Sequence, residues 1–153
     1  MKIKKVLLII LITVFITSCK TTKIEDTETV YIMVYDFENN VLKDVQVNLD
    51  GEKKGFSDVY GRFALSIAED DKKHTVELSK ENYETISFET KLDKNQVLYF
   101  KIGNADYYAK MAENSLDAVL YAEAKKYIEI AVSINPRKDY LYLKEVIENK
   151  QLQ

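Results

Sequence analysis

The stretch Val45-Gln46-Val47-Asn48-Leu49-Asp50-Gly51 decides the fold class of this 153-residue chain. Its apolar residues at 45, 47 and 49 alternate with polar residues at 46 and 48, and this period of two indicates a half-buried strand. The Asp-Gly pair that follows is a turn signal, because both residue types tolerate the backbone conformations of tight turns. The stretch therefore predicts a strand with one buried face that ends in a turn.

Six more segments between residues 30 and 103 have the same character. Each is short, with alternating or mostly apolar residues, and the segments are separated by turn signals at the spacing of about 8–12 residues that is typical of sandwiches. They lie at residues 30–35, around Phe56, and at 63–67, 74–78, 86–88 and 97–102. No long helical stretch interrupts them, so we expect a small antiparallel β-sandwich of about seven strands and no parallel sheet.

Two of these segments carry the motifs of a known family. The run Asn39-Asn40-Val41-Leu42-Lys43-Asp44-Val45-Gln46-Val47-Asn48-Leu49 is followed by Gly55-Phe56-Ser57-Asp58-Val59-Tyr60-Gly61-Arg62-Phe63-Ala64-Leu65. Together they resemble the carboxypeptidase regulatory-like domain, whose prealbumin-like fold has a V-x-V-x-L strand and then a T/S-D-x-x-G-x-F-x-L segment. The resemblance covers roughly residues 28–103 and implies a folding or binding role without catalysis. The related PEGA-type surface module is the alternative.

One departure from that family concerns Asn82-Tyr83, where the family usually has Gly-Tyr. Asparagine is one of the few residues other than glycine that reaches positive φ at low cost. We therefore expect Asn82 to adopt the backbone conformation of the missing glycine.

From Asn104 onward the apolar residues recur at steps of three and four, which indicates amphipathic helices. Asn104 is a suitable N-cap for a first helix, whose apolar positions run from Tyr108 to Val119. A second helix carries apolar residues from Tyr121 to Val132 and is ended by Pro136. A third helix runs from about Tyr140 to Lys150. The whole chain is therefore expected to be an α+β protein, with a sandwich followed by three helices.

Residues 121–136 resemble the second helix of a tetratricopeptide repeat, and small residues such as Ala112 and Ala124 would let paired helices approach closely. The resemblance covers one repeat, residues 105–138, plus a capping helix. It departs at Ser115, where the family usually has a large aromatic residue. One repeat is fewer than the three or so that a free-standing array needs, so the helices should pack on the sandwich, pair with another copy or contact a partner. A plain helical hairpin without repeat ancestry is the alternative.

Three tyrosines of the helical segment, Tyr107, Tyr127 and Tyr142, are left over by the predicted helix cores and are expected to be exposed. Tyrosine is enriched at protein interfaces, so these residues are candidates for partner binding. The alternative is that they merely cover the neighbouring domain.

Residues 1–18 have the pattern of a secretory signal peptide. Lys2, Lys4 and Lys5 precede an apolar run at residues 6–16. Such a run is too short to span the ~30 Å core of a bilayer as a helix, and it suits the apolar region of a signal peptide. A buried strand or helix, or a transmembrane anchor, is the alternative, which the lysine cluster disfavours.

The apolar run ends in Ile16-Thr17-Ser18-Cys19, which resembles the bacterial lipobox. The resemblance implies cleavage before Cys19 and attachment of lipid to its sulfur and to the freed amine, since several acyl chains anchor stably where one is marginal. Cys19 is the only cysteine, so a free thiol or an intermolecular disulfide is the alternative. Lys20 follows rather than Asp, which by similarity to known sorting rules favours the outer membrane if the cell has one. The polar residues 19–29 are expected to form a flexible tether.

The residue types offer little for catalysis. The formal net charge is −3, and removal of residues 1–18 leaves 19 basic against 25 acidic residues, a charge of −6 that argues against nucleic-acid binding. His74 is the only histidine and is expected at the surface. A zinc site would therefore lack ligands, and Cys/His catalysis would lack a partner for the histidine. Acidic groups at 69–71 and 36–39 lack the ligand spacing of a dedicated calcium site. We expect no cofactor, no metal and no enzymatic activity.

The sequence thus predicts a non-catalytic lipoprotein, anchored to a membrane of the cell envelope through lipid on Cys19, that binds another envelope protein. The alternative is a carbohydrate or surface-ligand binding module that uses tyrosines on the exposed sheet face. The expected organisation is a signal peptide at 1–18, a tether at 19–29, a sandwich at 30–103 and a helical segment at 104–153.

Overall fold

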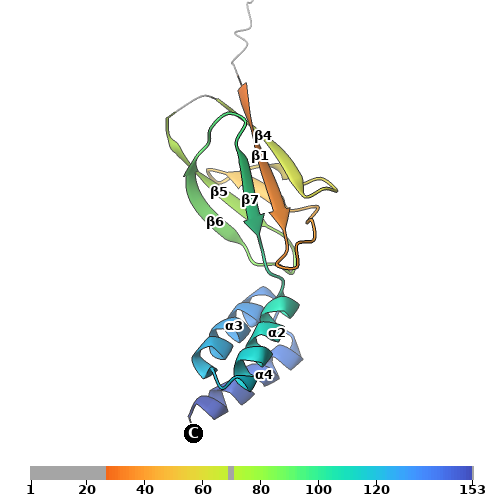
Figure 1. Ribbon diagram of the computed structural model, residues 1–153, viewed down its shortest axis with the longest axis vertical. Coiled ribbons are helices and arrows are strands. Elements are labelled where there is room, and N and C mark those ends of the chain that lie inside the picture. The colour runs from red at the N-terminus through yellow and green to blue at the C-terminus, as the bar shows by residue number, and fades with distance from the viewer. Residues whose placement is uncertain (1–26, 69–70, 153) are drawn as a thin grey trace, which may run out of the picture.

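The computed structural model describes residues 27–68 and 71–152 (Figure 1). The predicted signal peptide, Cys19 and most of the tether lie outside the described residues. No helix in the described part of the chain combines the length and the apolar character needed to cross a bilayer.

Seven strands form two sheets that pack face to face, and three helices follow them, so the expected α+β class is confirmed. One sheet has the order β4-β1-β7 and the other has the order β3-β2-β5-β6. The strands are β1 (Thr27–Tyr35), β2 (Gln46–Leu49), β3 (Glu52–Phe56), β4 (Arg62–Ala68), β5 (Lys73–Ser79), β6 (Ile86–Lys91) and β7 (Val97–Lys101).

The expectation of purely antiparallel sheets is wrong for one strand pair. β1 and β7 run parallel, with pairs from Tyr31 and Val97 to Tyr35 and Lys101. The cause is the path of the chain, because β6 ends at the same end of the sandwich at which β1 begins (Figure 1). The short connection at residues 92–96 crosses between the sheets there, so β7 must start beside the start of β1 and run in the same direction.

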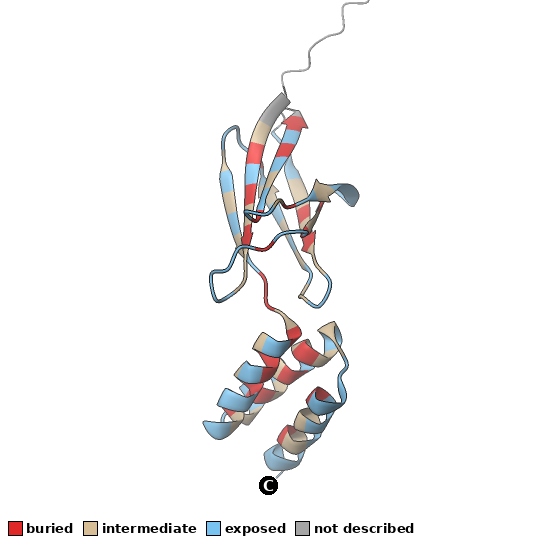
Figure 2. Ribbon diagram, turned by 90° about the vertical axis from the view of Figure 1, so that its right-hand side faces the viewer, coloured by how far each residue is buried: buried red, intermediate tan, exposed pale blue. Residues whose placement is uncertain are grey.

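Residues that alternate in the sequence alternate between core and surface in the structure. Val30, Ile32 and Val34 of β1 are fully buried, whereas the residues between them face outward (Figure 2). The other buried members of this core are Leu42, Val45, Val47, Leu49, Leu65, Ile67, Val76, Leu78, Leu92 and Ile102. The predicted strand periodicity therefore identified the inner face of the sandwich.

The turn before β4 is held by Asp58. The Asp58 Oδ1 atom accepts hydrogen bonds from the backbone N–H groups of Tyr60 at 2.9 Å and Arg62 at 3.0 Å. Gly61 has a φ of 71° and Asn82 a φ of 64°, so both occupy the left-handed region. The expectation that Asn82 adopts the left-handed conformation of the family's usual glycine is therefore confirmed.

The sheet extends further toward the N-terminus than predicted. β1 begins at Thr27, so the last residues of the predicted tether at 19–29 belong to a strand. Residues 27–29 pair with residues 68–66 of β4. The extension was not predicted because its sequence is polar. It forms because β4 continues to Ala68 and supplies hydrogen-bond partners for the additional backbone groups. Threonine is also well suited to a strand.

The three helices are α2 (Ala105–Asp117), α3 (Tyr121–Ile134) and α4 (Lys138–Gln151). Asn104 caps α2 as predicted, since its Oδ1 atom accepts a hydrogen bond from the N–H of Tyr107 at 2.7 Å. The helices bury a core of their own, separate from that of the sandwich. It comprises Ala105, Tyr108, Ala109, Ala112, Ala124, Ile128, Ala131, Tyr140 and Ile147.

Val119 was expected on the apolar face of the first helix, and this prediction is wrong. α2 ends at Asp117, and Val119 has a φ of 63° with 63% of its surface exposed. The N–H of Val119 bonds to the carbonyl of Leu116 at 3.0 Å and that of Leu120 to Ser115 at 2.8 Å, which is the Schellman pattern. Glycine usually occupies the left-handed position of this motif, so its absence hid the end of the helix.

Candidate functional site

The first candidate region is the junction between the sandwich and the helices. On the side of the sandwich, loops and the linker after β7 make this contact, and on the side of the helices the first turn of α2 makes it. The Glu84 Oε1 atom accepts a hydrogen bond from the N–H of Gly103 at 2.7 Å, and Tyr83 forms an isolated bridge with Asn104. Burial and a hydrogen bond to Glu84 raise the pKa of Tyr108 on α2. The junction is therefore fixed by specific bonds to backbone and side chain.

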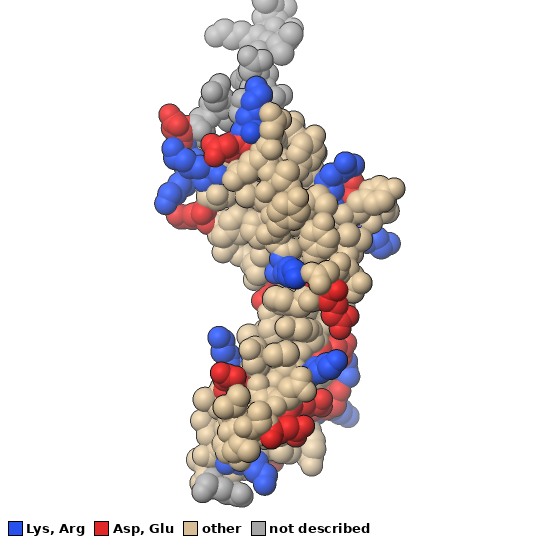
Figure 3. Space-filling model, in the orientation of Figure 1, with Lys and Arg blue, Asp and Glu red and all other residues tan. Residues whose placement is uncertain are grey.

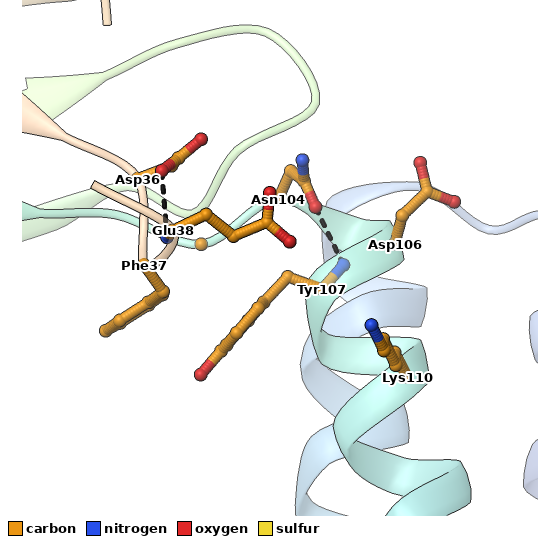
Figure 4. A pocket seen from close by; sticks show the side chains of 8 residues that line it. Asp36, Phe37, Glu38, Asn104, Asp106, Tyr107 and Lys110 are labelled. Atoms are coloured by element: carbon orange, nitrogen blue, oxygen red, sulfur yellow. Dashed lines mark hydrogen bonds between the residues drawn. The ribbon is translucent and has the colours of Figure 1, made fainter. Parts of the chain in front are cut away.

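Aromatic rings reinforce the junction from the side of the β1–β2 loop. Phe37 stacks on Tyr107 with ring centroids 4.7 Å apart, and Tyr108 lies edge-on to both rings. Figure 4 shows the loop that carries Asp36, Phe37 and Glu38 lying against the start of α2. The rings connect the loop and the helix, which fixes the direction in which α2 leaves the sandwich.

A hollow of about 170 Å³ lies at this junction. Its lining residues are Asp36, Phe37, Glu38, Gly103, Asn104, Asp106, Tyr107 and Lys110. The carboxylate of Asp36 is used by its own loop, since Oδ1 accepts from the N–H groups of Glu38 at 2.9 Å and Asn40 at 2.8 Å. Because Asp36 is engaged by its own loop, and Asp106 accepts a hydrogen bond from Arg137 at 2.8 Å, we regard the hollow as part of a structural joint.

Replacing Glu84 with alanine tests this joint. The N–H of Gly103 is buried and would lose its partner, so we expect the free energy of unfolding to fall by about 2 kcal/mol. Chemical denaturation followed by circular dichroism measures the change. Glu81→Ala in the same loop is the matched control, because Glu81 is exposed and should change stability little. Equal losses in the two variants would contradict this account of the junction.

The three tyrosines singled out by the sequence do not lie together on an open surface. Tyr107 and Tyr127 are only partly exposed, because Tyr107 packs on Phe37 and Tyr127 stacks on Tyr108 with centroids 6.3 Å apart. Tyr142 on α4 is 70% exposed. The predicted exposure is therefore correct for Tyr142 only, and Tyr107 covers the neighbouring domain, which was the alternative. For Tyr107 the reason is the Phe37 loop, whose approach to α2 no helical periodicity could reveal.

The second candidate region is the outer side of the β4-β1-β7 sheet. Here the outward residues of β1 pair with those of β7, Tyr31 with Val97 and Met33 with Tyr99. We call the group Tyr31, Met33, Tyr35, Val97 and Tyr99 the tyrosine face. Tyr31, Val97 and Tyr99 are exposed, and Met33 and Tyr35 are partly so. Figure 3 shows uncharged side chains over the front of these strands, with charged ones toward the margins.

The tyrosine face is hollowed at the end nearer the helices. An open depression of about 500 Å³ is lined by Tyr35, Asn39, Tyr99, Phe100 and Lys101. At its rim the ammonium group of Lys101 donates a hydrogen bond to the Asn39 Oδ1 atom at 2.7 Å. The depression thus combines aromatic rings with a few polar atoms at one end.

The third candidate region is the turn between α2 and α3, at the end of the helices remote from the sandwich (Figure 1). Val119 and Leu120 are exposed there, and Leu152, which follows α4, is also exposed. A shallow hollow of about 470 Å³ beside them includes Tyr121 and Gln151 among its lining residues. We call Val119, Leu120 and Leu152 the hairpin tip. Sequence reasoning missed it, although the interruption of the helical spacing before Tyr121 was a usable signal.

Two acidic side chains lie beside the α2–α3 turn of the hairpin tip. Asp117 ends α2, Glu123 lies in the first turn of α3, and both are exposed. An acid at the C-terminus of a helix is disfavoured by the negative end of the helix dipole, and α2 has no basic residue in its last turn. The α2–α3 turn therefore combines apolar contact area with two acids, and Lys150 in the last turn of α4 adds a basic group near Leu152.

His74, Asp50 and Tyr140 have structural partners. His74 is partly buried, not fully at the surface as expected, and its Nδ1 atom lies 2.8 Å from Asp50 Oδ2. The hydrogen bond from His74, then one from the N–H of Thr75, holds the pKa of Asp50 below its usual value. Burial and a hydrogen bond to Asp106 raise the pKa of Tyr140 to about 12. Within residues 27–68 and 71–152, no three side chains of the metal-binding types lie together.

Comparisons with known proteins give little further information. No protein-family model matches the chain, and no curated protein matches it. One solved structure that matches part of the chain is that of the Bacillus anthracis TIE protein, with 18% identity and a TM-score of 0.39. The match covers 51% of this chain and 16% of that chain.

Proposed function

We propose that this chain is a non-catalytic lipoprotein, anchored to a membrane of the cell envelope through lipid on Cys19, whose helical unit binds another envelope protein. The observation that carries the proposal is the hairpin tip. Val119 is strained and Leu120 is half-exposed, and neither contributes to the buried core of the helices. A strained backbone conformation beside an exposed apolar side chain is typical of surfaces selected for function.

Two further features support a binding role for the helices. The helical unit buries a core of its own, so the sandwich does not need it to cover apolar surface. The acidic side chains of Asp117 and Glu123 complement a partner whose contact surface is apolar with basic residues around it. The sequence Ile16-Thr17-Ser18-Cys19 supports the anchor, and it lies outside the described residues.

Affinity capture of the full chain from gently solubilised membranes tests this function. We expect a stoichiometric companion, whose recovery falls at least about tenfold in the Leu120→Ser variant because an apolar contact at the centre of an interface is lost. The control is Val59→Ser in a sandwich turn, an exposed apolar residue with an exposed fraction of 67% against 50% for Leu120. Recovery of the chain alone, or of the same companion with Leu120→Ser, would argue against partner binding at the tip.

The variant Val119→Gly separates binding from folding. Glycine removes the cost of the left-handed conformation, so we expect the free energy of unfolding to rise by about 0.5–1 kcal/mol, after allowance for the greater entropy of unfolded glycine. The same variant should recover less of the companion. Denaturant unfolding measures the first effect, and Val59→Gly, whose φ is not positive, should give no stabilisation. A destabilised Val119→Gly protein would contradict the assignment of strain.

A second candidate function is binding of a carbohydrate at the tyrosine face. It is favoured by the depression between Tyr35 and Tyr99, since aromatic rings with nearby polar atoms such as those of Asn39 and Lys101 are the usual components of ligand sites. A glycan-array screen of the protein tests it, with Tyr99→Ser as the comparison. The candidate is removed if no glycan binds, or if binding is the same in both proteins.

A further inference from the structure

The tyrosine face has a distribution of charge that is unusual for this chain. The charged side chains on the outer side of β4, β1 and β7 are Arg62 and Lys101, and among the described residues of these strands no acidic side chain shares that side. Arg62 is ion-paired with Asp58 of the preceding turn at 3.1 Å, which leaves Lys101 as the basic group of this face. The chain without residues 1–18 has six more acidic than basic residues, 25 against 19. A face that lacks acids in such a chain matches a surface that carries negative charge.

The side chains of this face also have a common physical character. Tyrosine combines an apolar ring with a polar hydroxyl group, and it is enriched where hydrocarbon meets headgroups at membrane surfaces. Tyr31, Tyr35 and Tyr99 lie on neighbouring strands with Met33 and Val97 between them. Lys101 lies at one end of the face and can reach anionic headgroups. Each basic residue close to a membrane surface is attracted appreciably by such headgroups.

The position of the face relative to the proposed anchor supports the same ligand. β1 supplies the centre of the face and begins at Thr27. Seven residues separate Cys19 from Thr27, and even fully extended they reach no more than about 28 Å. A lipid on Cys19 would therefore hold the start of β1 close to the bilayer at all times.

From these observations we propose that the tyrosine face rests on the lipid surface itself, with the strands of the β4-β1-β7 sheet lying along the bilayer and the hairpin tip left free for a partner. This inference rests on the proposed lipid anchor. A glycan is a weaker match, because apart from the tyrosine hydroxyl groups the polar side chains that line the depression are Asn39 and Lys101, at one end of the face. A lipid surface needs no such groups along the length of β1.

The sequence contains no tryptophan, so Tyr99→Trp introduces a sole indole reporter into the face. The full lipid-bearing chain is reconstituted in vesicles of phosphatidylcholine with phosphatidylglycerol, with and without lipids brominated near the headgroup. We expect the emission of this reporter to shift to shorter wavelength and to be quenched by the brominated lipid. The matched control is Tyr142→Trp on α4, because Tyr99 is 68% exposed and Tyr142 70%. The control should stay accessible to acrylamide in water.

A charge variant tests the electrostatic part. Adding Lys101→Glu to Tyr99→Trp should lower the ratio of shielded to accessible indole at least about fivefold on these vesicles, because an attraction becomes a repulsion. Salt should lower the ratio in the parent and raise it in the Lys101→Glu variant. Equal ratios in the two proteins at low salt would remove the role of Lys101 and with it the argument from charge.

The outcomes separate this inference from the proposed function. The mass of the chain recovered from cell membranes reports whether Cys19 carries lipid, and an unmodified Cys19 would refute the anchor. A lipid-bearing chain whose residue-99 indole is as accessible to acrylamide as the residue-142 indole would overturn docking and leave the anchor intact. Shielding that requires an added glycan or a captured protein, and does not occur on vesicles, would also overturn it.

Discussion

Replacing Gly61 with alanine is expected to lower the free energy of unfolding by about 3 kcal/mol, because a backbone penalty and a steric clash act together. Gly61 has a φ of 71°, where an L-residue is disfavoured. A Cβ atom there would lie 2.6 Å from the carbonyl oxygen of Val34 and 3.1 Å from the backbone nitrogen of Leu42. Both neighbours are backbone atoms, so no side-chain rotation relieves the contact.

The clash would disturb hydrogen bonds that connect three segments. The N–H of Val34 bonds to the carbonyl of Gly61 at 2.8 Å, and the N–H of Leu42 bonds to the carbonyl of Val34 at 2.9 Å. Urea unfolding followed by circular dichroism measures the loss. Gly51→Ala is the matched control, since Gly51 has a φ of 80° but no atom within 4 Å of a Cβ, and it should cost only about 1 kcal/mol. Similar losses at the two sites would show that the contact with Val34 is not the cause.

Gly61 also illustrates what the sequence could predict. The residues Asp58 to Gly61 act locally, because a carboxylate that bonds amides within a few residues and a glycine in a left-handed turn need no distant partner. The strand positions were predictable for the same reason, since one face of each strand is buried and the period of two follows. Because these signals are local, the order of the seven strands and three helices could be predicted from the sequence.

Features that depend on distant segments could not be predicted in this way. The parallel pairing of β7 with β1 depends on where β6 ends in space. Tyr107 is partly covered because Phe37, from a loop about 70 residues earlier, stacks on it. The hairpin tip was missed because Val119 occupies a position that glycine marks in most helices. Each of these misses involves a contact or a conformation that residue type alone does not signal.

Replacing Cys19 with serine is expected to abolish incorporation of fatty acid into the chain, the largest effect predicted for any single substitution here. The physical reason is that a thioether needs the sulfur of Cys19, which is the only cysteine, and serine offers a much weaker nucleophile. Metabolic labelling with an alkyne-bearing fatty acid measures the effect. In the wild-type protein we also expect a mass that lacks residues 1–18 and includes the added acyl chains, and in Cys19→Ser a mass that still includes those residues.

The control for this prediction is Ser18→Ala, which keeps a small residue before the cysteine and should be labelled like the wild type. The comparison is decisive because several acyl chains bind a bilayer stably and a polar tether of residues 20–26 has no apolar face to replace them. A wild-type chain that begins at Met1 with an unmodified thiol would refute the anchor. The hairpin tip would then remain a candidate interface. Nothing would hold the tyrosine face near lipid, because the short connection from Cys19 to β1 would no longer begin at a bilayer. Docking on the bilayer would then depend only on the charge and the aromatic rings of the face.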